Sequence, residues 1–190
     1  MDRKPVSVKS YANIAIVKYW GKADAERMIP STSSISLTLE NMYTETKLSF
    51  LPEDATGDVM YIDDELQGEK ETIKASKVLD LFRTNPNQHV KIETWNNMPT
   101  AAGLSSSSSG LSALVKAANE LFQVGKTQSE LAQIAKFASG SSSRSFFGPL
   151  AAWDKDSGEV YPVETDLKLA MIMLVLTDQK KPVSSRDGMK

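Results

Sequence analysis

Cysteine is absent from this sequence of 190 residues, and histidine occurs only once. The lack of cysteine excludes disulfide bonds, thiolate nucleophiles and zinc–thiolate centres, and a single histidine excludes a metal site built from several histidines. An excess of positive charge is also lacking, because 22 Lys and Arg residues face 24 Asp and Glu residues, which gives a formal net charge of −2. This balance argues against nucleic-acid binding and against binding to an anionic membrane surface.

Long hydrophobic segments are lacking as well. The longest apolar run, residues 169–176, is much shorter than the roughly 20 residues that cross a bilayer, and residues 1–5 lead into no apolar signal segment. With 41% hydrophobic and 24% charged residues, the composition is that of a globular protein that can bury a core. We therefore expect a cytoplasmic protein without a membrane span.

Strand and helix patterns are intermixed along the chain, without an internal repeat. Helical spacing of apolar residues predicts three helices, the last of which opens with Thr127 and Glu130 at the spacing of a capping box. Because strands and helices do not alternate regularly, the sequence predicts an α+β fold. The predicted strands are 6–17, 35–39, 46–50, 90–94 and an uninterrupted apolar strand over 169–176, and the predicted helices are 70–82, 108–122 and 127–138. We expect one domain over residues 1–180 and, in residues 181–190, the beginning of a C-terminal domain whose remainder is missing from this chain.

A run of small residues, 99–110, stands between a predicted strand and the most strongly periodic helix. It reads Pro-Thr-Ala-Ala-Gly-Leu followed by five serines and a glycine. At the N-terminus of a helix, unpaired backbone N–H groups, the helix dipole and serine hydroxyls together favour binding of phosphate oxygens. Gly103 would let the backbone approach such an anion closely. The alternative is a serine-rich linker, which the periodic helix starting within the run disfavours.

Two further stretches combine positive charge with hydroxyl groups. Residues 18–22 read Lys-Tyr-Trp-Gly-Lys after a predicted strand, and residues 139–145 place serines around Arg144 just beyond the third predicted helix. An arginine is suited to two-pronged contact with phosphate or carboxylate groups. Taken alone, each stretch is equally consistent with solvated surface charges or with a helix-to-strand turn.

Together these stretches resemble a known enzyme family. The run Pro99 to Ser107 is similar to the phosphate-binding signature of the GHMP small-molecule kinase superfamily. Within that superfamily the chain resembles the diphosphomevalonate decarboxylase family. The segments that carry this resemblance are residues 13–15, 18–22, 33–36, 99–104, 139–145 and 183–189.

The resemblance implies a GHMP kinase-type N-terminal domain, similar to domain 2 of ribosomal protein S5. It also implies an activity: ATP-dependent decarboxylation of mevalonate 5-diphosphate to isopentenyl diphosphate, with release of ADP, phosphate and CO2. ATP and Mg²⁺ are the implied cofactors, and a homodimer is the implied assembly. The family's general-base aspartate has no counterpart in this chain, and we expect it in the missing C-terminal part.

The resemblance also assigns roles to individual positions. It implies that Lys18 and Arg144 take part in catalysis, and it assigns no metal ligand. The residues implied to bind ATP are Pro99, Ala101, Ala102, Gly103, Leu104, Ser105, Ser106, Ser107 and Ser108. The residues implied to bind substrate are Tyr19, Trp20, Gly21, Lys22, Ser139, Gly140, Ser141, Ser142, Ser143, Arg144, Ser185 and Arg186.

Two other functions stay open from the sequence. A related GHMP kinase would stop at phosphorylation of mevalonate or phosphomevalonate, and the nucleotide loop alone does not separate it from the decarboxylase. A non-catalytic nucleotide-binding module would retain the serine loop without turnover.

Overall fold

The structure is a computed structural model that describes residues 4–24, 26–98 and 106–172. Its strands are β1 (Val6–Val17), β2 (Lys22–Asp24), β3 (Ile29–Pro30), β4 (Ser34–Phe50), β5 (Val59–Ile62), β6 (Glu65–Leu66), β7 (Val90–Asn96), β8 (Leu150–Trp153) and β9 (Val160–Val163). Its helices are α1 (Glu69–Leu79), α2 (Ser106–Leu121), α3 (Gln128–Ala138) and the short 3-10 helix η1 (Ser142–Phe146).

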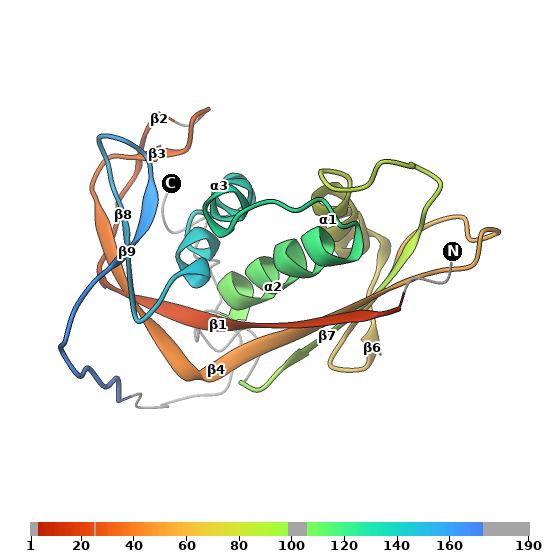
Figure 1. The fold of residues 1–190 in the computed structure, drawn as a ribbon, viewed down its shortest axis with the longest axis horizontal. Helices are drawn as coiled ribbons and strands as arrows, with labels where there is room; N and C mark the ends of the chain where they lie inside the picture. Colours follow the sequence, from red (N-terminus) through yellow and green to blue (C-terminus); the bar gives the residue numbers. More distant parts are fainter. Residues whose placement is uncertain (1–3, 25, 99–105, 173–190) are drawn as a thin grey trace.

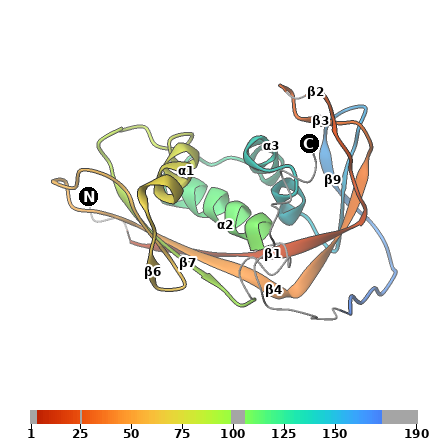
Figure 2. The same cartoon turned by 180° about the vertical axis from the view of Figure 1, so that it is seen from behind.

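The long strand β4 organises the main sheet. β1 pairs antiparallel with β4 from one end to the other, while β7 and β8 pair antiparallel with its C-terminal and N-terminal halves. β5 runs parallel to β7, and the connection between them contains α1. Figures 1 and 2 show α1, α2 and α3 on the same side of this sheet. The arrangement confirms the predicted α+β class.

Most of the core lies between the helices and the sheet. Fully buried residues from the sheet, Leu48 and Ile92, meet Val115 and Leu121 from α2 in one cluster with α1 and α3. Burying each such side chain contributes about 1.5–3 kcal/mol. A second, smaller cluster around Leu37 and Leu150 lies at the end of the sheet where β8 pairs with β4. This packing fixes α2 against β1 and β4, which carry the polar residues described below.

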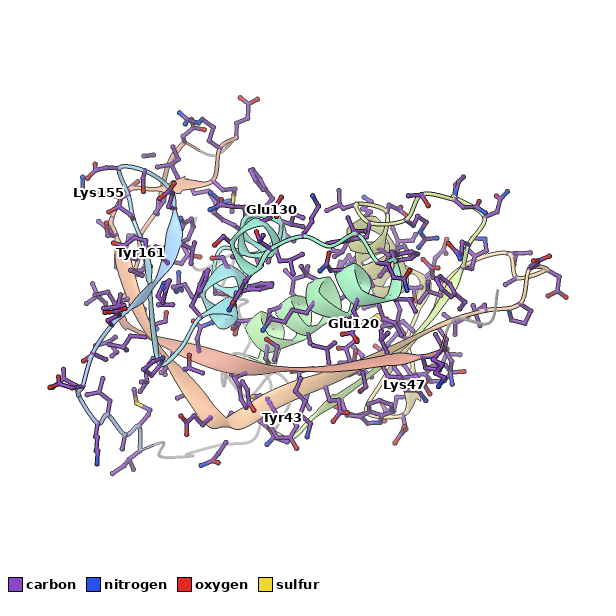
Figure 3. The ribbon with its side chains drawn as sticks, viewed as in Figure 1. Tyr43, Lys47, Glu120, Glu130, Lys155 and Tyr161 are labelled. Atoms are coloured by element: carbon purple, nitrogen blue, oxygen red, sulfur yellow. The ribbon has the colours of Figure 1, made fainter. Side chains whose placement is uncertain are left out.

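The three predicted helices are present with small shifts in their ends. The capping box of α3 is formed as expected, because the Thr127 side chain accepts from the Glu130 backbone while the Glu130 carboxylate accepts from the Thr127 N–H. Figure 3 shows Glu130 on the opening turn of this helix. No helix in the described ranges is long and apolar enough to cross a membrane.

The prediction of a central strand over residues 169–176 is wrong for the part that the structure describes. Residues 169–172 belong to no strand, and Ile172 is 85% exposed. A strand needs a hydrogen-bonded neighbour, and residues 169–172 pair with none of the strands in the described sheet. Residues 173–176 and the expected domain boundary at residue 180 lie outside the described ranges.

Candidate functional site

Arg144 is a buried cation held by hydroxyl groups. It lies in η1 with 2% of its surface exposed, its Nε donates to Ser36 Oγ at 2.5 Å and its Nη1 donates to Ser34 Oγ at 3.1 Å. Ser34 and Ser36 are two positions apart on β4, so they face the same side of the strand. Arg144 takes part in no ion pair within the described ranges. Among the residues that the structure describes, the site therefore holds a positive charge without a carboxylate to neutralise it.

Burial has a measurable effect on this guanidinium. It lowers the pKa of Arg144 to about 10, which still leaves the group fully protonated at neutral pH. A buried charge without a partner is expensive, and an anionic ligand that contacts the group recovers much of that free energy. The planar fork of an arginine matches the oxygens of a phosphate or carboxylate. The geometry around Arg144 is thus suited to an anion.

Two aromatic rings pack beside the guanidinium. Tyr19 and Trp153 form an edge-to-face pair with ring centroids 4.8 Å apart, and the Arg144 Cζ lies 5.5 Å from the first centroid and 5.8 Å from the second. Gly140 permits this packing, because a Cβ at that position would lie 2.7 Å from two atoms of the Trp153 ring. Cation–π attraction and the close backbone approach together restrict the orientation of Arg144.

The serines of the 139–145 stretch divide into two groups. Ser139 and Ser141 are partly exposed, and their hydroxyls lie 3.2 Å apart, within reach of each other and of a ligand. Ser142 and Ser143 are fully buried; Ser143 donates to the Gly140 carbonyl, whereas the Ser142 hydroxyl has no partner among the described residues. Ser143 thus supports the turn, and the partly exposed pair is placed to contact a ligand.

The predicted 18–22 stretch reaches this site through Tyr19. Lys18 and Lys22 are exposed and form no ion pair in the part of the chain that the structure describes. The Trp20 side chain is 61% exposed, and the Trp20 backbone N–H donates to Thr32 Oγ1. Gly21 has a φ of +57°, a left-handed conformation that favours glycine. This turn separates the tyrosine from the second lysine, so the structure brings together Tyr19, Gly140 and Arg144.

The serine-rich run leads into α2, as expected. The helix begins at Ser106, its first turn carries no acidic residue, and Ser107 is exposed. Ser108 and Ser109 are fully buried, and Ser109 Oγ lies 2.7 Å from Thr44 Oγ1 on β4. The N-terminus of α2 is therefore free of negative charge of its own, which is the condition for anion binding there. The other predicted ATP-binding residues (Pro99, Ala101, Ala102, Gly103, Leu104 and Ser105) and the predicted substrate residues Ser185 and Arg186 lie outside the described ranges.

Four residues of the site had no role assigned from the sequence. Ser34 and Ser36 hold the guanidinium, and Trp153 packs on it. Asn13 donates to the Ser141 carbonyl at 3.0 Å and to Ser145 Oγ at 2.7 Å, so it ties the η1 turn to β1. Buried serines at alternate positions of a strand were a usable signal for the first two, but no local pattern identifies the tryptophan.

The described residues contain no cluster of metal-binding side chains. Within the described residues, no group of three or more His, Asp and Glu side chains converges in a way that could hold a metal ion. Mg²⁺ in phosphoryl-transfer enzymes is commonly bound by substrate phosphates together with one or two carboxylates. The residues present are therefore compatible with an ion that arrives with a nucleotide.

Comparison with known proteins places this chain in a family. Residues 10–161 match the family described as diphosphomevalonate decarboxylase-like N-terminal domain. The diphosphomevalonate decarboxylase of Candida albicans is 34% identical over 207 residues, which cover 97% of this chain and 57% of the relative. The chain thus spans little more than half the length of this curated relative.

Solved structures give the same result. Mevalonate pyrophosphate decarboxylase from Streptococcus pyogenes superposes with a TM-score of 0.92 at 67% identity, covering all of this chain and 60% of that one. A structure of MDDEF in complex with MVAPP, AMPPCP and magnesium superposes with a TM-score of 0.79 at 36% identity, covering 98% of this chain and 60% of that one. From the matched residues, the shared fold and these identities, we conclude that the chain belongs to the diphosphomevalonate decarboxylase-like family and contains its N-terminal domain.

Proposed function

We propose that the protein catalyses ATP-dependent decarboxylation of mevalonate 5-diphosphate to isopentenyl diphosphate, with release of ADP, phosphate and CO2. The observation that carries this proposal is Arg144, a buried guanidinium whose partners among the described residues are hydroxyl groups and not carboxylates. A diphosphate supplies the negative charge that this site lacks. Its oxygens would also accept from the partly exposed hydroxyls of Ser139 and Ser141.

The second ligand of the proposed reaction is ATP. The N-terminus of α2 supplies backbone N–H groups and the positive end of the helix dipole, and Ser107 is exposed there. Residues 99–108 would then surround the phosphates of ATP. A related protein bound to MVAPP, AMPPCP and magnesium supports the pairing of these two ligands.

The chemistry explains why ATP is consumed. The tertiary 3-hydroxyl of mevalonate 5-diphosphate is a poor leaving group, and transfer of the γ-phosphoryl group converts it into a good one. The bond to the carboxylate then breaks, its electron pair forms the new double bond, and phosphate departs with CO2. Exposed Lys18 and Lys22, together with Arg144, would neutralise charge on the two anions. Mg²⁺, bound to the ATP phosphates, would add to this neutralisation.

Substitution of Arg144 tests the proposal in the full-length protein. Truncating a buried, hydrogen-bonded charge should lower kcat/KM for mevalonate 5-diphosphate by at least about 100-fold in Arg144→Ala. Arg144→Lys keeps the charge but loses the planar fork, so its loss should be intermediate. Circular dichroism serves as the folding control. Unchanged kcat/KM in the folded Ala variant would refute the role of this residue.

The products decide between the proposed reaction and a kinase. CO2 and isopentenyl diphosphate should form in equal amounts with ADP. Formation of ADP and a stable phosphorylated product, without CO2, would instead identify a GHMP kinase that acts on mevalonate or phosphomevalonate. Nucleotide binding without ADP formation would identify a non-catalytic module.

We also propose the domain division, assembly and location that the resemblance implies. Residues 1–180 would form the N-terminal nucleotide- and substrate-binding domain, residues 181–190 would begin a C-terminal domain, and the protein would be a cytoplasmic homodimer. Light scattering on the full-length protein measures the assembly, limited proteolysis measures the division near residue 180, and cell fractionation measures the location.

A further inference from the structure

Lys116 on α2 is a largely buried amine that contacts two other elements. Its Nζ donates to Ser10 Oγ on β1 at 3.1 Å and to the Ser145 carbonyl on η1 at 3.2 Å. The same Nζ lies 4.9 Å from the centroid of the Phe146 ring. One side chain therefore links the helix that follows the serine run to the turn that carries Arg144.

No carboxylate in the described part of the chain compensates the charge of this lysine. Lys116 forms no ion pair within the described ranges, and burial lowers its pKa from 10.5 to about 8. Glu120, one turn further along α2, is exposed and lies at the end of the helix (Figure 3). An unpaired buried ammonium lowers stability compared with an apolar side chain of similar length. Stability alone does not account for a lysine here.

The acceptors of Lys116 do not depend on it for hydrogen bonding. Ser10 Oγ also lies 2.7 Å from Ser112 Oγ, and the Ser145 carbonyl also accepts from Ser10 Oγ at 3.3 Å. Removing the amine therefore leaves neither group unpaired. What would be lost is the fixed link between α2 and the carbonyl of the residue that directly follows Arg144.

That link matters because η1 is short. A 3-10 helix of five residues has few internal hydrogen bonds of good geometry, so its orientation depends on neighbouring elements. The Arg144 side chain bonds to β4, while the backbone of the next residue bonds to Lys116. The turn is thus held by β4 through Arg144, by β1 through Asn13 and by α2 through Lys116, and loss of the α2 contact removes one of the restraints on the guanidinium.

We propose that Lys116 is a positioning residue of the Arg144 site, which fixes η1 against α2 and β1 so that the guanidinium is oriented for the diphosphate. The identity of that ligand rests on the proposed function; the hold on the turn does not. Local features that lower stability are expected where function requires them.

The test compares Lys116→Met, Lys116→Gln and Lys136→Met in the full-length protein. Methionine keeps the length of the side chain without a donor, and glutamine restores an N–H donor without charge. Lys136 is the matched control, because it is also buried and donates to a backbone carbonyl, that of Gly158, outside η1. We expect the dissociation constant of mevalonate 5-diphosphate to rise about 10-fold in Lys116→Met, to recover partly in Lys116→Gln, and to stay unchanged in Lys136→Met. Thermal stability of Lys116→Met should equal or exceed that of the wild type.

Amide hydrogen exchange separates this proposal from the proposed function. The Phe147 N–H donates to the Arg144 carbonyl at 3.3 Å and reports on the turn without any ligand. Its exchange should accelerate about 10-fold in Lys116→Met and not in Lys136→Met. Faster exchange with unchanged affinity, or unchanged exchange, would overturn the positioning role. Wild-type protein that does not bind mevalonate 5-diphosphate would refute the proposed function, and exchange alone would then decide whether Lys116 holds the turn.

Discussion

Arg144 is a buried cation within η1, and Lys116 is a partly buried cation on α2 that contacts the same segment. Burial lowers the pKa of both groups, and neither has a carboxylate partner in the described ranges. Such an arrangement weakens the folded state and strengthens attraction for an added anion. The balance between these effects is open to measurement at each residue separately.

The pH dependence of stability should reveal the burial of Lys116. The pKa of Lys116 is about 8 in the folded chain and 10.5 in the unfolded chain. Below about pH 8 the lysine is therefore protonated in both states, and the full free-energy cost of burying its charge lowers the stability of the folded state. Between about pH 8 and about pH 10.5 the folded state loses its proton first, so stability rises relative to Lys116→Met. Over this pH interval the free energy of unfolding should rise by at most about 3 kcal/mol.

Urea unfolding of wild type and Lys116→Met at about pH 7 and about pH 9.5 measures this change. Groups that face Lys116 from β1 and η1 are serines, an aromatic ring and a backbone carbonyl, so none titrates in this interval. The variant should be more stable at the lower pH, and the difference should shrink at the higher. A difference that is equal at both values would contradict the assignment.

Gly140 should tolerate no side chain, whereas Gly110 should accept one. A Cβ at Gly140 would lie 2.7 Å from the ring of Trp153, which is fully buried and has no space to retreat. We expect Gly140→Ala to destabilise the protein by about 1–3 kcal/mol and to weaken diphosphate binding, because the ring it displaces packs on Arg144. Gly110 lies inside α2 with nothing within 4 Å of its Cβ position, so Gly110→Ala should stabilise by up to about 1 kcal/mol. Denaturant unfolding of both variants checks the contrast.

The sequence singles out Arg144 and Tyr19 as candidate site residues but does not predict which residues surround them. Local patterns of hydroxyl groups, charge and glycine predict which segments are candidates for anion binding. They do not identify the partners of Arg144, because Ser36 lies 108 positions away in the sequence and meets it only through the fold. Trp153 gives no signal at all, since a tryptophan in a short apolar strand is expected in any core.

The strand β4 shows that secondary structure, too, is only partly predictable from the sequence. Its two alternating stretches predict separate strands over 35–39 and 46–50. In the structure β4 is continuous, and residues 40–42 form an irregularity opposite the step from Tyr11 to Ala12 on β1. Extra residues in a strand disturb the pairing locally without ending it, and sequence alternation alone does not reveal that. Figure 3 shows Tyr43 and Lys47 along the continuous strand.

Asp58 connects three segments far from the Arg144 site. It accepts from Ser76 Oγ on α1 at 2.6 Å, from Arg83 Nη2 at 2.6 Å and from the Val90 N–H at 2.8 Å, with its side chain 2% exposed. Asp58→Ala leaves a buried guanidinium without this partner and should cost about 3–5 kcal/mol. Glu71→Ala, which breaks an exposed pair with Lys74, should cost less than about 1 kcal/mol. Equal unfolding midpoints for the two variants would contradict this account.

The net charge of the chain is negative, whereas its candidate site is positively charged. The net charge is −2, while both ligands of the proposed reaction are polyanions. Within this chain, attraction would therefore come from cations near the site and not from the overall charge. Two kinds of cation would contribute under the proposed function, the buried Arg144 and the exposed Lys18 and Lys22.

Salt should separate these two contributions. Between about 0.02 M and about 0.5 M salt the Debye length falls from roughly 20 Å to roughly 4 Å, which screens exposed charges far more than buried ones. We expect the dissociation constant of mevalonate 5-diphosphate, measured by calorimetry on the full-length protein, to rise by less than about 10-fold over this range. Lys22→Gln should flatten the salt dependence, because it removes a screened charge. Arg144→Ala should weaken binding at every salt concentration and leave the slope in place, since the buried contact is little screened. The reverse pattern, a slope carried by Arg144 and not by Lys22, would mean that the guanidinium meets its ligand in open solvent, which is incompatible with its burial between β4, Tyr19 and Trp153.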